Sequence, residues 1–221
     1  MKKILCMLLL AFSLSAFADV DLGLSNWQYS GNGVNVTWSG GTYTGEAGAF
    51  KGSLSGAGVF DSPSFITYCV ELDQHFGWSS NLTGYNIVSP AAYTSGHPNG
   101  WGANSVAIGN RLGQLLTYSL PLVNDAAMST SLQLAIWNTI YDTDSTVSSG
   151  SFTDTSIYAA QANAFLSGSS SSTNIYQIGV LNNASSQDFI AYAPVPEPST
   201  GLMMLSGFMA GVFVLKRRAP K

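Results

Sequence analysis

The chain has 221 residues, of which 46% are hydrophobic, 12% aromatic and only 9% charged, and its formal net charge is −4 at pH 7. Six of its eight basic residues lie among the first three and the last six positions, so residues 19–193 hold two basic residues against eleven acidic ones. This net charge of −9 disfavours binding to nucleic-acid phosphates or to an anionic membrane surface, and we expect no nucleic-acid partner.

The N-terminus has the pattern of a secretory signal peptide. Two lysines follow the first methionine, an apolar run covers residues 4–12, and the small-residue sequence Ala16-Phe17-Ala18 comes next. This order predicts a signal peptide over residues 1–18, cut before Asp19.

The chain contains two cysteines, Cys6 and Cys69. Cys6 lies in the expected signal peptide, so the mature chain keeps Cys69 alone. An exported protein with one thiol forms no internal disulfide. Cys69 is therefore a buried bystander, an intermolecular link or a reactive group.

Strand patterns come first in the exported part. From Asp19 to about residue 65, short apolar and polar alternations are broken by glycine, and the glycine-rich segment 31–58 fits an edge meander or a mobile arm. The segment 65–72 is the clearest strand, because β-branched and aromatic residues dominate it. Residues 85–88 are a further candidate.

Helical spacing follows. Apolar residues at three- and four-residue intervals predict helices over 105–119, ended by Pro121, and over 125–141, with Asn124 or Asp125 as N-cap. A third helix is expected over 156–166, with Gly168 as its stop, and closing strands over 174–180 and 188–192. These elements predict one α+β domain over 19–193, an antiparallel β-rich fold with two or three inserted helices.

Two residues stand out chemically, Cys69 and Gln133. Gln133 lies near the apolar stripe of its predicted helix, on one face with Trp137. Taken singly, each has an ordinary explanation: a helix glutamine binds a neighbouring backbone group or water, and an unpaired cysteine is a small buried hydrophobe.

Together the segments Tyr68-Cys69 and Gln133-Leu134-Ala135-Ile136-Trp137 resemble the Cys-Gln thioester domains of bacterial surface proteins. In that family an aromatic residue precedes a strand cysteine, and a later helix carries glutamine followed by Ala-Ile-Trp or a close variant. Leu132 stands where many such domains have threonine. The resemblance implies that the Cys69 sulfur and the Gln133 side-chain carbonyl are joined, with loss of ammonia, as an internal thioester.

A thioester is a much better electrophile than an amide, because thiolate is a good leaving group. It survives in water only where neighbouring side chains exclude hydroxide. Tyr68, Trp137 and Tyr141 are the candidates for this shielding, although aromatic residues at such positions are often plain core. We expect a partner amine to attack the Gln133 carbonyl and to release the Cys69 thiol. The amine could belong to a surface polysaccharide, to a protein lysine or to another copy of this chain.

The sequence offers residues for two other site chemistries. A cysteine hydrolase would need a histidine beside Cys69, and the chain offers His75 and His97. Asp142 and Asp144 suggest Ca²⁺, but their segment lacks the glycine and the final glutamate of the usual loop. We expect neither an enzyme nor a metal or cofactor site.

A non-reactive biofilm-matrix or carbohydrate-binding domain is the alternative function. Exposed tryptophans would stack on sugar rings, whereas tryptophans of a β-rich domain commonly lie in its core. The four candidates are Trp27, Trp38, Trp78 and Trp101.

The C-terminal segment 194–221 has three parts in order: Pro196-Glu197-Pro198, the uncharged apolar stretch 201–215, and the basic cluster Lys216-Arg217-Arg218. This order resembles the PEP-CTERM sorting signal of Gram-negative bacteria that make exopolysaccharide. The resemblance implies a transmembrane helix stopped by the basic cluster, a transient inner-membrane anchor and processing near the motif by an exosortase. The expected destination is the cell surface or the extracellular matrix.

Overall fold

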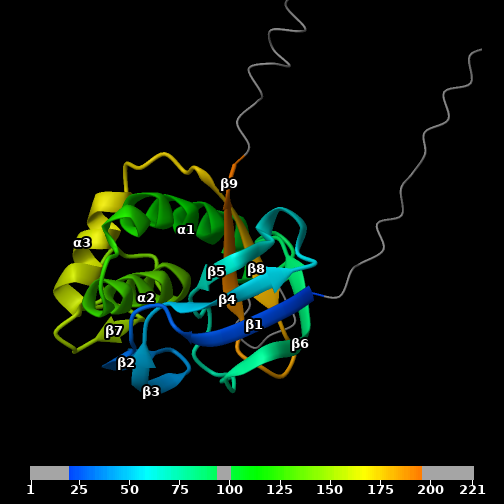
Figure 1. The fold of residues 1–221 in the computed structure, drawn as a ribbon. Helices are drawn as coiled ribbons and strands as arrows, with labels where there is room; N and C mark the ends of the chain where they lie inside the picture. Colours follow the sequence, from blue (N-terminus) through cyan, green and yellow to red (C-terminus); the bar gives the residue numbers. More distant parts are fainter. Residues whose placement is uncertain (1–19, 94–100, 196–221) are drawn as a thin grey trace, which may run out of the picture.

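The computed structural model describes residues 20–93 and 101–195, and Figure 1 shows their arrangement. Several predictions therefore lie outside the described residues. They are the signal peptide, His97, the Pro-Glu-Pro motif, the apolar C-terminal helix and the basic cluster.

The described residues form nine strands and three α-helices with short 3₁₀ turns between some of them. The strands are β1 (Val20–Trp27), β2 (Asn32–Trp38), β3 (Gly41–Ala47), β4 (Phe50–Ser55), β5 (Ser62–Thr67), β6 (Ser79–Val88), β7 (Thr153–Asp154), β8 (Tyr176–Asn182) and β9 (Phe189–Pro194). The helices are α1 (Ser105–Ser119), α2 (Ala126–Tyr141) and α3 (Ala159–Ser169).

Six strands form an antiparallel sheet in the order β5-β4-β1-β6-β8-β9. The chain that continues from β5 then pairs with the first residues of β9: the Ile190 N–H donates to the Tyr68 carbonyl at 3.0 Å, and Cys69 forms a bridge with Phe189. The Thr67 hydroxyl adds a 2.6 Å bond to the Ile190 carbonyl. The sheet thus closes on itself, and Cys69 lies at the closure.

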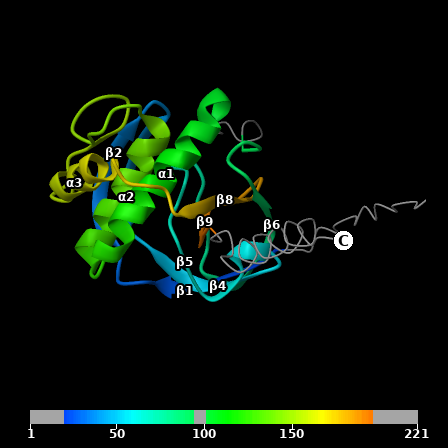
Figure 2. The same ribbon diagram turned by 90° about the horizontal axis from the view of Figure 1, so that it is seen from above.

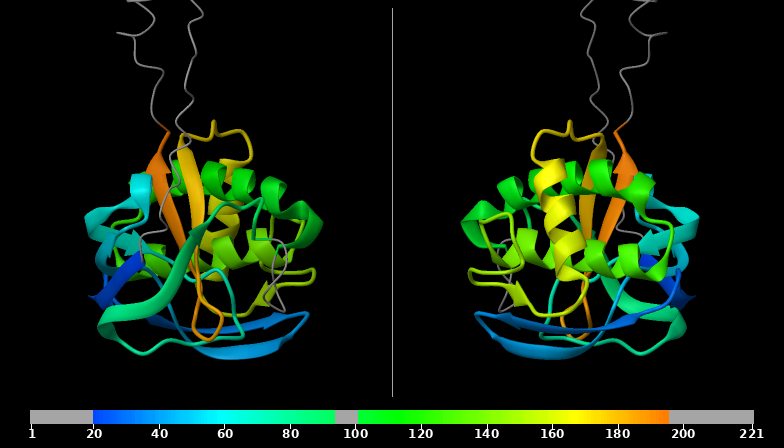
Figure 3. Two further views of the ribbon diagram at one scale, coloured as in Figure 1. Left: turned by 90° about the vertical axis from the view of Figure 1, so that its right-hand side faces the viewer. Right: turned by 90° about the vertical axis from the view of Figure 1, so that its left-hand side faces the viewer.

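A smaller sheet has the order β3-β2-β7. Along β2 the side chains of Val34, Val36 and Trp38 point inward while the residues between them do not, which is the alternation of a half-buried strand. In both views of Figure 3 the hairpin of β2 and β3 lies along the bottom of the molecule. The hairpin contacts α2, so it reaches the helix that carries Gln133.

The three helices pack against one another beside the closed sheet, as Figure 2 shows from above. Pro121 falls in the 3₁₀ turn that follows α1, as expected for a residue that ends a helix. The Asp125 carboxylate caps α2 by accepting from the Met128 N–H at 2.8 Å. Among the described residues, no helix combines the length and the apolar character needed to cross a membrane.

The antiparallel β-rich fold with a few helices is confirmed. The bounds of α1 match the prediction, and α2 begins one residue later than predicted. The strand predicted over 65–72 is β5, which starts at Ser62 and ends at Thr67, because the chain then leaves β4 to pair with β9. The glycine-rich segment 31–58 is ordered as β2, β3 and β4, and β4 is an interior strand between β5 and β1.

The third helix differs most from its prediction. It begins at Ala159 and ends at Ser169, so Gly168 lies inside its last turn and does not stop it. Gly168 faces the ring of Tyr118, so a side chain at position 168 would require that ring to shift. The glycine at position 168 therefore allows α3 to pack closely on α1.

Candidate functional site

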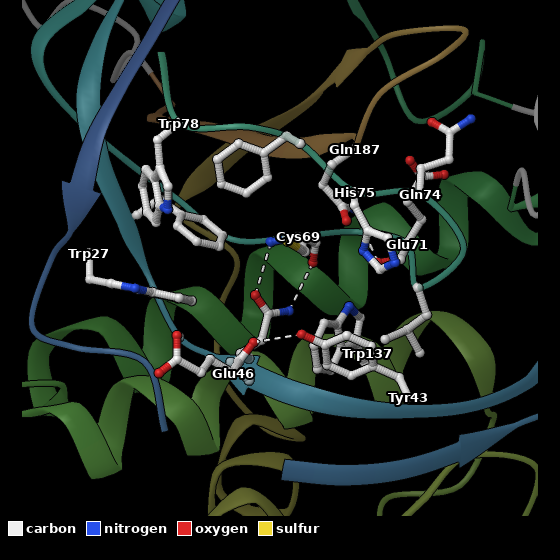
Figure 4. A pocket seen from close by; sticks show the side chains of 16 residues that line it. Trp27, Tyr43, Glu46, Cys69, Glu71, Gln74, His75, Trp78, Trp137 and Gln187 are labelled. Carbon is white, nitrogen blue, oxygen red and sulfur yellow. Dashed lines mark hydrogen bonds between the residues drawn. The ribbon is translucent and has the colours of Figure 1, made fainter. Parts of the chain in front are cut away.

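The side chain of Gln133 binds the main chain of Cys69 in both directions. Its Nε2 donates to the Cys69 carbonyl, and its Oε1 accepts from the Cys69 N–H, each at 2.9 Å (Figure 4). Cys69 is 8% exposed and Gln133 is 1% exposed. A buried amide bound in this way is fixed, and its carbonyl carbon is held beside the residue that carries the thiol.

The strand side of this pair is held by the closure of the sheet. The Val70 N–H donates to the Asp188 carbonyl at 3.1 Å, and the Asp188 N–H donates to Glu71 Oε1 at 2.8 Å. The Asp188 carboxylate in turn accepts from the Tyr93 hydroxyl at 2.6 Å and the Asn183 N–H at 2.6 Å. This buried polar network fixes the backbone that follows Cys69.

The helix side is held by two hydroxyls near the start of α2. Thr130 donates to the Ala47 carbonyl at 2.8 Å, and Ser129 accepts from the Ala49 N–H at 2.8 Å. These bonds tie α2 to the turn between β3 and β4. Gln133 lies one helical turn beyond Ser129, so the bonds also set the height at which its amide meets Cys69.

A pocket of about 220 Å³ opens over the pair. One wall comes from β3 and the turn after it, another from the segment between β5 and β6, and the floor from α2 (Figure 4). The lining residues are Trp27, Tyr43, Glu46, Ala47, Gly48, Phe50, Cys69, Glu71, Leu72, Gln74, His75, Phe76, Trp78, Gln133, Trp137 and Gln187.

Aromatic rings dominate one side of this pocket. The Trp78 ring packs edge-on against Trp27 at 5.6 Å and against Phe76 at 5.2 Å between centroids. Trp78 remains 49% exposed, so this cluster forms part of the pocket mouth. The lining carries two carboxyl groups, Glu46 and Glu71, and no lysine or arginine is among these described residues.

Burial determines the ionisation of the groups around the pair. It raises the pKa of the Cys69 thiol well above its usual range, and the charge of Glu71 adds to the shift. Burial also raises the pKa of Glu71 to about 8, with a further contribution from Asp188 and a smaller opposing one from the Asp188 N–H bond. The pKa of Tyr43 rises to about 12, mainly through burial. At neutral pH Cys69 is therefore a neutral thiol.

Of the three predicted shielding residues, Trp137 lines the pocket. Tyr68 is 1% exposed and lies in the core, outside the pocket lining. The Tyr141 hydroxyl accepts from the Leu72 N–H at 3.0 Å, which supports the strand segment that leads away from Cys69. The shielding role remains a prediction, and geometry favours Trp137 for it.

The same site geometry also bears on the cysteine-hydrolase and calcium-binding alternatives. His75 lines the pocket with Cys69. Catalytic cysteines, however, have a lowered pKa, whereas burial raises that of Cys69. The Asp142 carboxylate accepts backbone N–H groups of Thr143 and Phe152 at 2.7 and 3.1 Å, so it acts as a loop cap.

The four tryptophans divide into two groups. Trp38 and Trp101 are buried, so they are not available to stack on a ligand as an exposed tryptophan would. Trp27 and Trp78 lie together at the pocket mouth. Of these four described residues, only Trp27 and Trp78 therefore keep ring surface that a ligand could reach.

Sequence reasoning missed Tyr43, Glu46 and Glu71 as pocket residues. Tyr43 packs edge-on against Trp137 at 6.0 Å, and its hydroxyl donates to the Glu46 carbonyl at 2.9 Å. Glu71 follows Cys69 by two positions, and its acidic side chain in an apolar strand was the one available signal. Nothing local in β3 indicates that Tyr43 faces α2.

Comparison with known proteins identifies the C-terminal segment. Residues 194–218 match the PEP-CTERM protein-sorting motif. This motif supports export of the chain and its sorting to the cell surface by an exosortase system. No curated protein and no solved structure matches the chain closely enough to indicate a relationship.

Proposed function

We propose that the exported domain attaches covalently to a partner nucleophile through an internal thioester between Cys69 and Gln133. Each copy of the domain would attach once and would not act again on a second partner. The pair of 2.9 Å hydrogen bonds that fix the Gln133 amide on the Cys69 main chain is the observation that carries it. Because the amide is already held in place, bond formation needs little loss of conformational entropy.

Burial favours the survival of such a bond. Both residues are largely inaccessible to water, and Trp137 and Tyr43 lie edge-on to each other beside them. A thioester in this position would meet bulk water through the pocket. Exclusion of water is the general requirement for keeping a reactive intermediate intact.

The pocket lining favours an amine as the nucleophile. Glu46 supplies an exposed carboxylate at the pocket, and Trp27 and Trp78 supply aromatic faces that attract cations. A protonated amine is therefore concentrated at the mouth, where it becomes the nucleophile once it has lost its proton to water, whereas an anionic group is repelled. Lysine side chains and amino sugars of a surface polymer carry this group.

Intact mass of the exported chain tests the proposal. The wild-type chain should be lighter by one ammonia than its sequence requires, and exposure to methylamine should add one methylamine. Peptide mapping should place that methylamine on Gln133. Cys69→Ala should have the full sequence mass and should take up no methylamine.

The matched control is Gln177→Glu, which changes a glutamine of β8 outside the pocket lining. This variant should keep both the ammonia deficit and the methylamine uptake. A wild-type chain of full sequence mass, with a Cys69 thiol that reacts in the folded state, would rule the thioester out.

Non-covalent carbohydrate binding is the second candidate, favoured by the exposed Trp78 beside Trp27. Retention on a glycan surface should then survive Cys69→Ala and disappear in Trp78→Ala. A covalent adhesin behaves in the opposite way, since Cys69→Ala ends attachment that resists denaturant.

Processing of the tail forms the remaining part of the proposal. We infer that an exosortase cuts the chain near Pro196-Glu197-Pro198 after a transient stay in the inner membrane, which places the domain in the matrix or on the surface. Replacement of these three residues by alanine should leave the uncut chain in the membrane fraction. Unchanged processing and surface display would refute this role.

A further inference from the structure

Closing the proposed thioester requires proton transfers that the two reacting side chains do not provide. The Cys69 thiol must lose its proton before sulfur attacks the Gln133 carbonyl carbon. The amide nitrogen must gain a proton before it leaves as ammonia. Since burial keeps Cys69 a neutral thiol, a nearby group has to accept the first proton.

Two buried acids, Glu71 and Asp188, lie in this region, and of the two it is Glu71 that lines the pocket. It is 1% exposed, it lines the same pocket as Cys69 and Gln133, and its charge acts on the Cys69 thiol. Its Oε1 accepts from the Asp188 N–H at 2.8 Å, which fixes the carboxyl group. The Gln187 side chain binds the Glu71 carbonyl at 3.1 Å and holds the backbone as well.

We propose that Glu71 carries the proton from the Cys69 thiol to the departing nitrogen of Gln133 while the thioester closes. This inference rests on the proposed function. The Glu71 carboxylate takes the thiol proton as the S–C bond forms, and it returns the proton to nitrogen as the C–N bond breaks. Ammonia leaves, Glu71 ends as it began, and no oxidant or other reactant is consumed.

The other ionisable groups around Glu71 are less suited to this transfer. The Asp188 carboxylate is engaged by the Tyr93 hydroxyl, the Asn182 side chain and the Asn183 N–H. Burial raises the pKa of Tyr85, Tyr93 and Tyr141, so these phenols stay protonated. Asp73 and His75 are exposed to solvent.

The ionisation of Glu71 suits the task. Burial and the neighbouring Asp188 raise its pKa to about 8. A group with this pKa populates both its acid and its base form near neutral pH, which is the condition for efficient general acid–base catalysis. The base form increases as pH rises and becomes dominant above about pH 8.

Formation of the thioester can be started at a defined time in the mature chain, which runs from Asp19 onward. The chain is recovered in denaturant with Cys69 capped as a mixed disulfide, then refolded, and the cap is removed with a reductant. Loss of one ammonia is followed by intact mass at a series of pH values. The wild-type rate should rise with pH and level off near pH 8.

Glu71→Gln keeps the shape of the side chain and an oxygen that can accept from the Asp188 N–H. It should slow closure by about 100-fold or more, the usual contribution of a positioned acid–base group. Circular dichroism verifies that the variant is folded. The control Asp73→Asn changes an exposed neighbouring carboxylate and should close at close to the wild-type rate.

The outcomes separate this inference from the function on which it rests. If folded Glu71→Gln closes at the wild-type rate, or if the wild-type rate keeps rising above pH 8, Glu71 is not the proton carrier and the thioester stands. If the wild type never loses ammonia, the proposed function fails first. Should Glu71→Gln not fold, the wild-type pH profile still decides.

Discussion

The Gln133 side-chain amide binds both main-chain groups of Cys69, its N–H and its carbonyl, each at 2.9 Å. A neighbouring strand would otherwise supply such bonds. Removing the amide leaves two buried backbone groups without these bonds. In a Cys69→Ala background, which excludes any thioester, adding Gln133→Ala should lower the free energy of unfolding by about 2 kcal/mol or more. Chemical denaturation measures this difference.

The control for that experiment is Gln161→Ala in the same background, a half-buried glutamine of α3. It should cost much less, since alanine is the better helix former. Equal costs at the two positions would mean that the Gln133 bonds contribute nothing specific.

Tyr43 lines the pocket together with Cys69 and Gln133. Its ring packs on Trp137 at 6.0 Å, and its hydroxyl donates to the Glu46 carbonyl at 2.9 Å. Tyr43→Ala should open the pocket to water and speed hydrolysis of the thioester, seen as gain of one water in intact mass over time. Tyr43→Phe keeps the ring and should hydrolyse slowly, as should Tyr118→Ala on α1. Equal hydrolysis rates in the wild type and all three variants would mean that Tyr43 does not protect the thioester from water.

Gly52 allows β4 to lie close to β1. A Cβ at this position would collide with the Gly23 carbonyl, a main-chain atom that cannot turn aside. Gly52→Ala should therefore lower the free energy of unfolding by about 3 kcal/mol, in the range of an overpacked core. Gly33→Ala on β2 is the matched control, because a Cβ there meets no atom within 4 Å. Similar melting temperatures for the two variants would contradict this account.

Local signals predicted the first two helices well. Apolar spacing and Pro121 locate α1, and the carboxylate of Asp125 that begins α2 forms the cap bond expected of it. The Cys69 and Gln133 segments were also recognisable, and they lie in contact. Each of these features depends on residues close together in sequence or on a motif.

Features that depend on contacts between residues far apart in the sequence were not predicted. The interior place of β4 depends on Gly52 fitting against another strand, and glycine-rich sequence by itself is equally typical of an edge or a loop. The end of β5 at Thr67 depends on pairing with β9, more than a hundred residues later. The pocket combines β3, the segment after β5 and α2, so Tyr43 acquires its position only through the tertiary fold.

Glu71 should also make the stability of the domain depend on pH. Its pKa is about 8 in the folded state against an ordinary value of 4.5, so the folded chain keeps a proton that the unfolded chain releases. The free energy of unfolding should therefore fall as pH rises from about 4.5 to about 8, and the contribution should be constant above that. Glu71→Gln has no such proton and should lack this part of the decline.

Denaturation of the Cys69→Ala chain with and without Glu71→Gln, at several pH values, isolates the effect from the thioester. Asp73→Asn serves as the control and should retain the decline of the parent chain. The difference between the parent and Glu71→Gln should grow steadily across the window and stay level above it. Parallel profiles would mean that the folded domain holds no extra proton on Glu71 across this window, so its pKa would not be raised and the rate of thioester formation should not level off near pH 8.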